Sequence, residues 1–125
     1  MLNIMIVDDS LIIRKTLTTE LEKLGHHVIA TARSGKEAVD LYGKYMPDLV
    51  TMDITMPVMN GIEALKRIKN SYSDVNIIMV TSHGEEKLVM DAIVNGAQGY
   101  ILKPINSEKL IDVLNKIFPE LNDNL

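Results

Sequence analysis

The chain has 125 residues, 46% of them apolar and 24% charged, and a formal net charge of −4, which is typical of a globular domain with its own core. It contains no cysteine, so disulfides and thiolate metal sites are excluded. Basic residues are mixed with acidic ones, and there is one Phe and no Trp to stack on bases, so we do not expect nucleic-acid binding.

The first half of the chain predicts two strands that alternate with two helices. Continuous apolar runs at 2–7 and 28–32 are too short for core helices and indicate strands. Between them, apolar residues recur at helical spacing: Ile13, Leu17, Leu21 and Leu24. Gly25 then supplies a left-handed residue that ends the helix. The second helix is expected to begin at Ser34, because Ser34 and Glu37 have the spacing of a capping box.

The second half continues the alternation. Strands are expected at 49–52, 77–80 and 100–102, and a helix at about 60–70. The two remaining helices are indicated by apolar residues at helical spacing: Leu88, Val89, Ala92 and Ile93 in one, Leu110, Leu114 and Ile117 in the other. The polar end "PELNDNL", residues 119–125, is expected to fray.

Continuous apolarity predicts strands that are covered on both faces, which is typical of parallel sheets. Strands alternating with helices therefore predict an α/β sandwich around a parallel sheet. We expect one domain over residues 1–120, followed by a short polar tail at 121–125 and no output domain. No apolar stretch approaches the roughly 20 residues that span a bilayer, and the start lacks a basic n-region, so we expect a cytoplasmic protein.

Polar residues follow several of the predicted strands. Asp8 and Asp9 end the first apolar run, Asp53 the third, Thr81 the fourth and Lys103 the fifth. In a parallel sheet all these side chains gather at the carboxyl edge, where open α/β sheets bind ligands.

Three clustered carboxylates need a neutralising partner. Each like-charge pair costs roughly 4 kcal/mol at about 4 Å and an effective dielectric near 20. A proton or a divalent cation relieves this repulsion, and a site of carboxylates without His or Cys suits Mg²⁺ or Mn²⁺. Lys103 and Thr81 add an ammonium and a hydroxyl that suit phosphoryl oxygens. The set is typical of phosphoryl transfer to an aspartate.

The same residues carry a resemblance. The segments "VDDS", "MDITMPVMNGIEAL", "VTS" and "YILKP" resemble, in order and spacing, the four signature segments of the response-regulator receiver domain. The segments "DITMP" and "NGIEAL" resemble in particular the stand-alone, CheY-like regulators of chemotaxis. The resemblance covers essentially the whole chain and implies a flavodoxin-like doubly wound sheet of five strands in the order 2-1-3-4-5. Ile105 departs from the family, which more often places Phe after the Lys-Pro pair.

The resemblance implies a role for each site residue. Asp53 would be the phosphoacceptor and would take its phosphoryl group from a histidine kinase or a small phosphodonor. Asp9, Asp53 and the backbone carbonyl of Thr55 would hold Mg²⁺, and Asp8 would act through bound water. Lys103 would contact the phosphoryl group, and the peptide bond that follows it would be cis.

The resemblance also implies a switch. Thr81 would move toward the new phosphate and Tyr100 would rotate inward, which would reshape the surface of the fourth helix, fifth strand and fifth helix. The protein would be a monomer that signals by binding a flagellar motor switch or a phosphotransfer protein. It would not be an enzyme in the usual sense, although it would support its own phosphoryl transfer and autodephosphorylation.

Plainer interpretations stand beside these. Asp8 or Asp9 would serve as a helix N-cap, Thr81 and Ser82 would start the fourth helix, and Tyr100 would be a core residue. In this family, positions such as His83 and Thr55 tune phosphate hydrolysis, and a solvent-facing His is the alternative.

Three other functions are considered. The first is a phosphorelay intermediate, or another single-domain regulator outside chemotaxis. The second is a Mg²⁺-dependent aspartyl phosphatase of the haloacid-dehalogenase type, but "ITMP" after Asp53 does not match its D-x-D-x-T pattern. The third is an FMN binder, whose phosphate the segment "DDSLIIR" would repel.

Overall fold

Five parallel strands form the central sheet, in the order β2-β1-β3-β4-β5. The computed structural model describes residues 1–82 and 86–124. The strands are β1 (Asn3–Val7), β2 (His27–Ala32), β3 (Leu49–Met52), β4 (Ile77–Thr81) and β5 (Gly99–Leu102). The parallel pairing and the strand order confirm the expected fold, and each predicted strand is correct to within one residue at either end.

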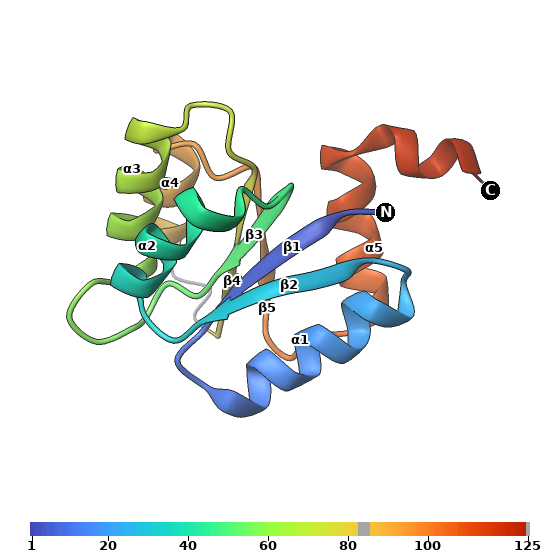
Figure 1. The fold of residues 1–125 in the computed structure, drawn as a ribbon, viewed down its shortest axis with the longest axis horizontal. Helices are drawn as coiled ribbons and strands as arrows, with labels where there is room; N and C mark the ends of the chain where they lie inside the picture. Colours follow the sequence, from blue (N-terminus) through green and yellow to red (C-terminus); the bar gives the residue numbers. More distant parts are fainter. Residues whose placement is uncertain (83–85, 125) are drawn as a thin grey trace.

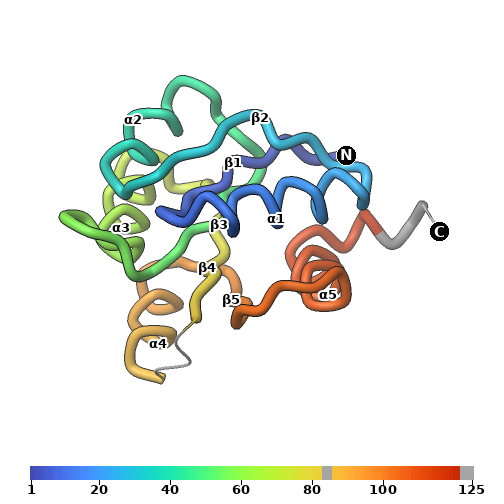
Figure 2. The backbone as a smooth tube through the Cα atoms, turned by 90° about the horizontal axis from the view of Figure 1, so that it is seen from below, coloured from blue at the N-terminus to red at the C-terminus, as the bar shows by residue number. Residues whose placement is uncertain are grey.

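Helices cover both faces of this sheet (Figures 1 and 2). They are α1 (Leu11–Lys23), α2 (Gly35–Tyr45), α3 (Gly61–Ser71), α4 (Glu86–Val94) and α5 (Ser107–Ile117). Helices α2, α3 and α4 pack on one face of the sheet, and α1 and α5 pack on the other. None of the described helices is long and apolar enough to cross a membrane.

Strand β1 shows why the apolar runs are continuous. Its side chains alternate between the two faces, so Met5 and Val7 join the core under α2 and α3, whereas Ile4 and Ile6 join the core under α1 and α5. All four side chains are buried. Because residues 4–7 are buried on both faces of the sheet, none of them faces water, which explains the unbroken apolar run there.

The ends of the helices follow local sequence signals. Gly25, at φ +91°, lies just past α1 as predicted. Ser34 caps α2 by accepting a hydrogen bond from the Glu37 amide. The Glu37 side chain accepts from the Arg33 amide at 3.3 Å, so the predicted capping box reaches one residue further back than expected.

The end of the chain differs from the prediction. Residues Pro119–Asn124 form a 3₁₀ helix, η1, where fraying was expected. Leu121 packs against the core under α1 and α5, and its amide donates to the Phe118 carbonyl at 3.0 Å. Among the described side chains of the tail, Leu121 thus supplies an apolar contact that the polar composition of the segment hides.

His26 is buried at the amino edge of the sheet, away from the polar strand ends. Its Nδ1 accepts a hydrogen bond from the Leu2 amide at 3.1 Å, so this nitrogen must be unprotonated. Burial, and then the charge of the N-terminal ammonium, lower the pKa of His26 below its ordinary 6.5. Folding therefore favours the neutral imidazole.

This preference predicts that acid weakens the fold through His26. Because its folded pKa is depressed, the stabilisation is fully present above pH 6.5 and is lost progressively as the pH falls from 6.5 through the lower folded pKa. His26→Asn keeps an acceptor near the Nδ1 position but does not titrate. We expect urea unfolding between pH 7.5 and 5.5 to show a smaller loss of stability in His26→Asn than in the unaltered chain. The exposed neighbour provides the control: His27→Asn should retain the full loss, and an equal loss in all three proteins would contradict the assignment.

Candidate functional site

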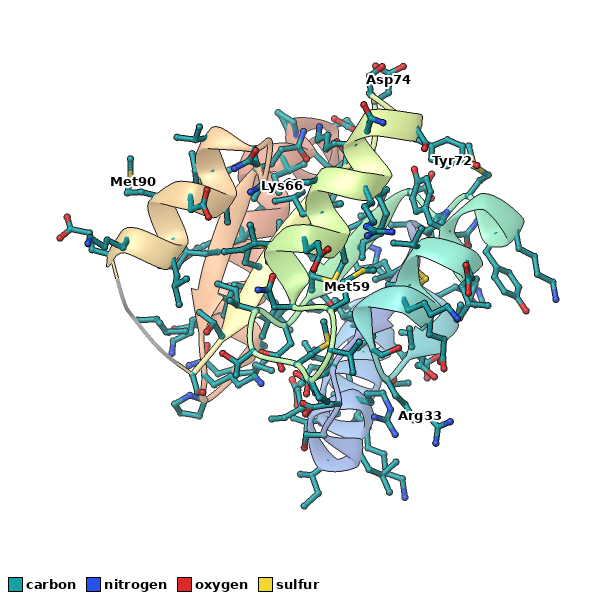
Figure 3. The ribbon with its side chains drawn as sticks, turned by 90° about the vertical axis from the view of Figure 1, so that its left-hand side faces the viewer. Arg33, Met59, Lys66, Tyr72, Asp74 and Met90 are labelled. Atoms are coloured by element: carbon teal, nitrogen blue, oxygen red, sulfur yellow. The ribbon has the colours of Figure 1, made fainter. Side chains whose placement is uncertain are left out.

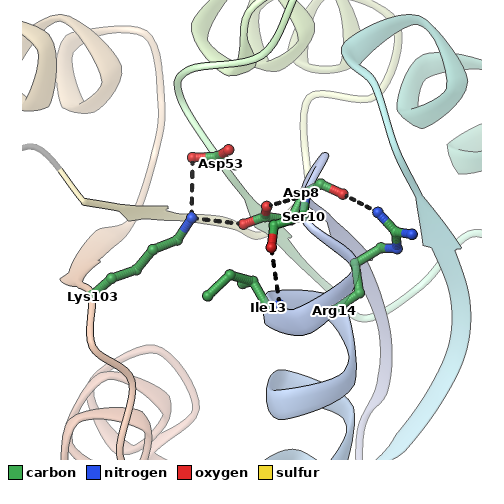
Figure 4. Close-up of polar contacts among 6 residues, drawn as sticks. All are labelled: Asp8, Ser10, Ile13, Arg14, Asp53 and Lys103. Carbon is green, nitrogen blue, oxygen red and sulfur yellow. Dashed lines mark hydrogen bonds and ion pairs between the residues drawn. The ribbon is translucent and has the colours of Figure 1, made fainter.

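The polar ends of the strands meet at the carboxyl edge of the sheet, as predicted (Figure 4). Asp8 and Asp9 follow β1, Asp53 follows β3, Thr81 ends β4 and Lys103 follows β5. Asp8, Asp53 and Thr81 are buried, and Asp9 is exposed. The site thus has a buried floor and an acidic rim that is open to solvent.

Backbone hydrogen bonds between neighbouring strands continue past the strand ends and hold three of these residues. The Asp8 amide donates to the Ala32 carbonyl at 3.0 Å, the Asp53 amide to Val7 at 2.9 Å and the Lys103 amide to Thr81 at 2.8 Å. Because each of these backbone bonds continues a parallel ladder, the three charged residues start from fixed backbone positions.

The acidic side chains converge. Asp8, Asp9 and Asp53 each offer a carboxylate oxygen, and these atoms lie within 4.8 Å of one another. The Lys103 Nζ lies 2.9 Å from Asp8 Oδ2 and 3.6 Å from Asp53 Oδ1, with 15% of its side chain exposed (Figure 4). One ammonium therefore bridges two of the carboxylates, a pairing of Lys103 with Asp8 that the sequence did not indicate.

The environment of the site raises the pKa of Asp53. Burial, followed by repulsion from Asp8, raises its pKa from 3.8 to about 6, and Lys103 opposes part of this rise. Asp9 adds a smaller repulsion. The Asp53 carboxylate is thus mostly ionised at neutral pH, although its surroundings disfavour the charged form. Binding of a cation in the cluster is therefore favourable.

The turn after β1 orients Asp8. Its Oδ1 accepts from the Ser10 amide at 2.9 Å, and the Arg14 guanidinium donates to its backbone carbonyl at 2.8 Å (Figure 4). Ser10, three residues before Ile13, caps α1 by accepting from the Ile13 amide. The suggestion that Asp8 or Asp9 caps this helix is therefore wrong, and the Ser10 spacing was the signal to use.

The loop between β3 and α3 packs tightly on Asp53. The Gly61 amide donates to the Ile54 carbonyl at 2.8 Å, and a Cβ at Gly61 would overlap the Asp53 carbonyl oxygen. Met56 is buried, and Met59 packs against the core, in agreement with the view that these methionines fill gaps (Figure 3). The close approach at Gly61 was missed, although the dipeptide Asn60-Gly61 marked a turn.

The other predicted residues are placed as follows. Thr55 lies in this loop and is exposed. Tyr100 is 45% exposed on the edge strand β5, so its reading as a core residue is wrong. Thr81 belongs to β4, so it does not start the fourth helix, which is described from Glu86 onward. His83 lies outside the described residues. The Lys103–Pro104 peptide is cis, as the resemblance implied.

Comparisons with known proteins agree with this geometry. Residues 4–115 match the model of the response regulator receiver domain. The chain is 44% identical to the chemotaxis protein CheY of Bacillus subtilis over 90% of this chain and 94% of that protein. It is 40% identical to CheY of Thermotoga maritima over 91% and 95%. Among solved structures it resembles a chain of the CheX-CheY-BeF3-Mg complex of Borrelia burgdorferi, with a TM-score of 0.90 and 38% identity over 93% of this chain and 88% of that one.

The raised pKa of Asp53 predicts that its charge destabilises the fold. Because the folded pKa exceeds 3.8, the native state binds the proton more tightly, and the contribution of Asp53 to stability falls as the pH rises from about 4 to about 6. Without divalent cations at pH 7, we expect Asp53→Asn to raise the free energy of unfolding by about 1–2 kcal/mol, after allowance for solvent screening. The gain should disappear at pH 4 in urea titrations.

Asp74→Asn is the matched control, because Asp74 is an exposed aspartate that follows α3 at the opposite end of that helix from Met59 (Figure 3). We expect it to leave the free energy of unfolding unchanged. An Asp53→Asn protein that is less stable than the unaltered chain at pH 7 would show that the bond to Lys103 outweighs the repulsion.

The close approach at Gly61 predicts intolerance of any side chain. We expect Gly61→Ala to lower the free energy of unfolding by about 1–3 kcal/mol, because backbone would have to shift to make room for the methyl group. Gly99→Ala is the control, since a Cβ there would lie 3.4 Å from the Val113 side chain, at the edge of ordinary contact. Denaturant unfolding checks the order, and equal losses in the two variants would refute the steric argument.

Proposed function

Because the chain belongs to the response regulator receiver domain family, we propose that it accepts a phosphoryl group on Asp53 and signals through the α4–β5–α5 surface. The observation that carries the proposal is the buried Asp53 carboxylate, 3.6 Å from the Lys103 ammonium and within 4.8 Å of two further carboxylates. Similarity to chemotaxis proteins on both sequence and structure supports chemotaxis as the pathway.

In the proposed step, a carboxylate oxygen of Asp53 attacks phosphorus. An O–P bond forms while the P–N bond of a kinase phosphohistidine breaks, and the imidazole leaves. With an acyl phosphate the P–O bond breaks instead and the carboxylate leaves. Only the ionised form of Asp53 is a nucleophile, and with a pKa near 6 most of it is ionised at pH 7.

The donor set fits a divalent cation of the Mg²⁺ type. Carboxylate oxygens without His or Cys are the ligands that Mg²⁺ prefers, and the cluster carries more negative charge than Lys103 neutralises. Asp9, Asp53 and the Thr55 carbonyl would hold the ion, with Asp8 acting through water. When bound, the ion would neutralise these carboxylates and draw charge from the phosphoryl oxygens.

Lys103 and Thr81 would stabilise the product. Phosphorylation of Asp53 places a charge of about −1.5 to −2 on the phosphoryl group. The Lys103 ammonium bridges Asp8 and Asp53, so it lies close enough to contact an oxygen of a phosphoryl group on Asp53. Thr81 ends β4, the strand next to β3, and its hydroxyl is a donor for a second oxygen.

The proposed output surface is apolar and exposed. A groove of about 400 Å³ between α4 and β5 is lined by Glu86, Val89, Met90, Ile93, Tyr100 and Leu102. Met90 points away from the sheet in Figure 3, and 52% of it is exposed. Exposed apolar side chains of this kind suit a protein partner, which we propose to be a flagellar motor switch or a phosphotransfer protein.

The test is phosphorylation by acetyl phosphate, read by intact mass. With Mg²⁺ we expect the mass of one phosphoryl group to be added, with none added when the ion is chelated. Asp53→Asn should add none, because the nucleophile is gone, whereas Asp74→Asn should behave as the unaltered chain does. A protein that stays unphosphorylated in Mg²⁺, or that is phosphorylated equally as Asp53→Asn, would overturn the proposal.

A further inference from the structure

Lys109 binds the backbone on both sides of Lys103. Its Nζ lies 3.0 Å from the Leu102 carbonyl oxygen and 3.0 Å from the Pro104 carbonyl oxygen, and it donates to both. Its own amide donates to the Asn106 side chain at 2.9 Å, which caps α5. Lys109, in the first turn of α5, thus makes hydrogen bonds to three residues along the segment from β5 to the helix.

The position of Lys109 is unfavourable for the helix. Near a helix N-terminus the macrodipole disfavours a cation, and an acidic residue is preferred there. Lys109 is the third residue of α5, directly after Glu108, which obeys the rule. A residue that breaks a local rule is expected to have a compensating role, and two charge-assisted hydrogen bonds to the loop provide one.

The Leu102 carbonyl also has no strand to pair with. Strand β5 lies at the edge of the sheet, and the Lys103 amide points toward β4, where it bonds the Thr81 carbonyl. Backbone groups alternate in direction along a strand, so the Leu102 carbonyl points outward, away from the sheet. The Lys109 ammonium therefore donates the hydrogen bond that a further strand would have donated to this carbonyl.

We propose that Lys109 is a positioning residue for the phosphoryl transfer, acting through Lys103. It touches neither carboxylate, but it binds the carbonyl of the peptide unit that precedes Lys103 and the carbonyl of Pro104, one residue after it, and so restrains the backbone from which the Lys103 side chain starts. The Lys103 ammonium must reach both Asp8 and Asp53, and small displacements of a positioned group slow a reaction strongly. The inference rests on the proposed function, because it concerns the rate of that step.

The experiment is a double-mutant cycle on phosphorylation by acetyl phosphate in Mg²⁺. We expect Lys109→Met to lower the rate constant about tenfold. In a Lys103→Met background the same substitution should have no further effect, because the group that it positions is gone. Lys109→Arg, which keeps two donors, should recover most of the rate. Lys116→Met, which removes a charge from the exposed last turn of α5, should leave it unchanged.

A second measurement is independent of the reaction. The NMR resonance of the Lys103 Cε should move in Lys109→Met and stay in place in Lys116→Met. Equal losses of rate in both Lys103 backgrounds, or an unmoved Lys103 resonance, would reduce Lys109 to a structural residue. An unaltered chain that takes no phosphoryl group overturns the proposed function, whereas an unaltered chain phosphorylated no faster than Lys109→Met overturns the positioning role alone.

Discussion

The bridge from Lys103 to Asp8 and Asp53 is the interaction on which the site depends. A carboxylate pair at about 4 Å repels by roughly 4 kcal/mol at an effective dielectric near 20, and two of these carboxylates are buried. One ammonium relieves the pairs that it touches but leaves the cluster net negative. Burial, and after it the remaining repulsion, raise the pKa of Asp53. The same imbalance that weakens the fold prepares the site for a cation or a proton.

Holding such a cluster together requires a stiff frame, and the parallel sheet provides it. Ladder bonds continue past the ends of β1, β3 and β5, so the backbones of the charged residues cannot retreat from one another. Polar groups of the helices then fix the turns: Ser10 and Arg14 hold Asp8, and Lys109 holds the backbone around Lys103. The site is thus built on the sheet and adjusted from the first turns of the helices.

The sequence predicts most of this frame because its signals are local. Continuous apolar runs identified the strands, and Gly25 and Ser34 identified helix ends, since burial on two faces and terminal hydrogen bonds depend on neighbouring residues. The pairings of Lys103 with Asp8 and of Arg14 with the Asp8 carbonyl depend on turn geometry or on strands distant in sequence, so no local pattern reports them. Tyr100 was open to misreading for a related reason: β5 lies at the edge of the sheet, and an aromatic residue in a short apolar run does not reveal this.

The edge position of β5 also connects the site to the proposed output surface. Tyr100 pairs with Met79, and Leu102 pairs with Thr81, so the exposed side chains of β5 are in register with the end of β4. Lys103 follows Leu102 directly, and both Tyr100 and Leu102 line the groove against α4. Under the proposed function, a shift of Lys103 or Thr81 toward a phosphoryl group therefore acts on residues that themselves form the binding surface. A central strand, covered on both faces, could not present its side chains to a partner, whereas the edge strand β5 exposes Tyr100 and Leu102 next to the residue that contacts Asp53.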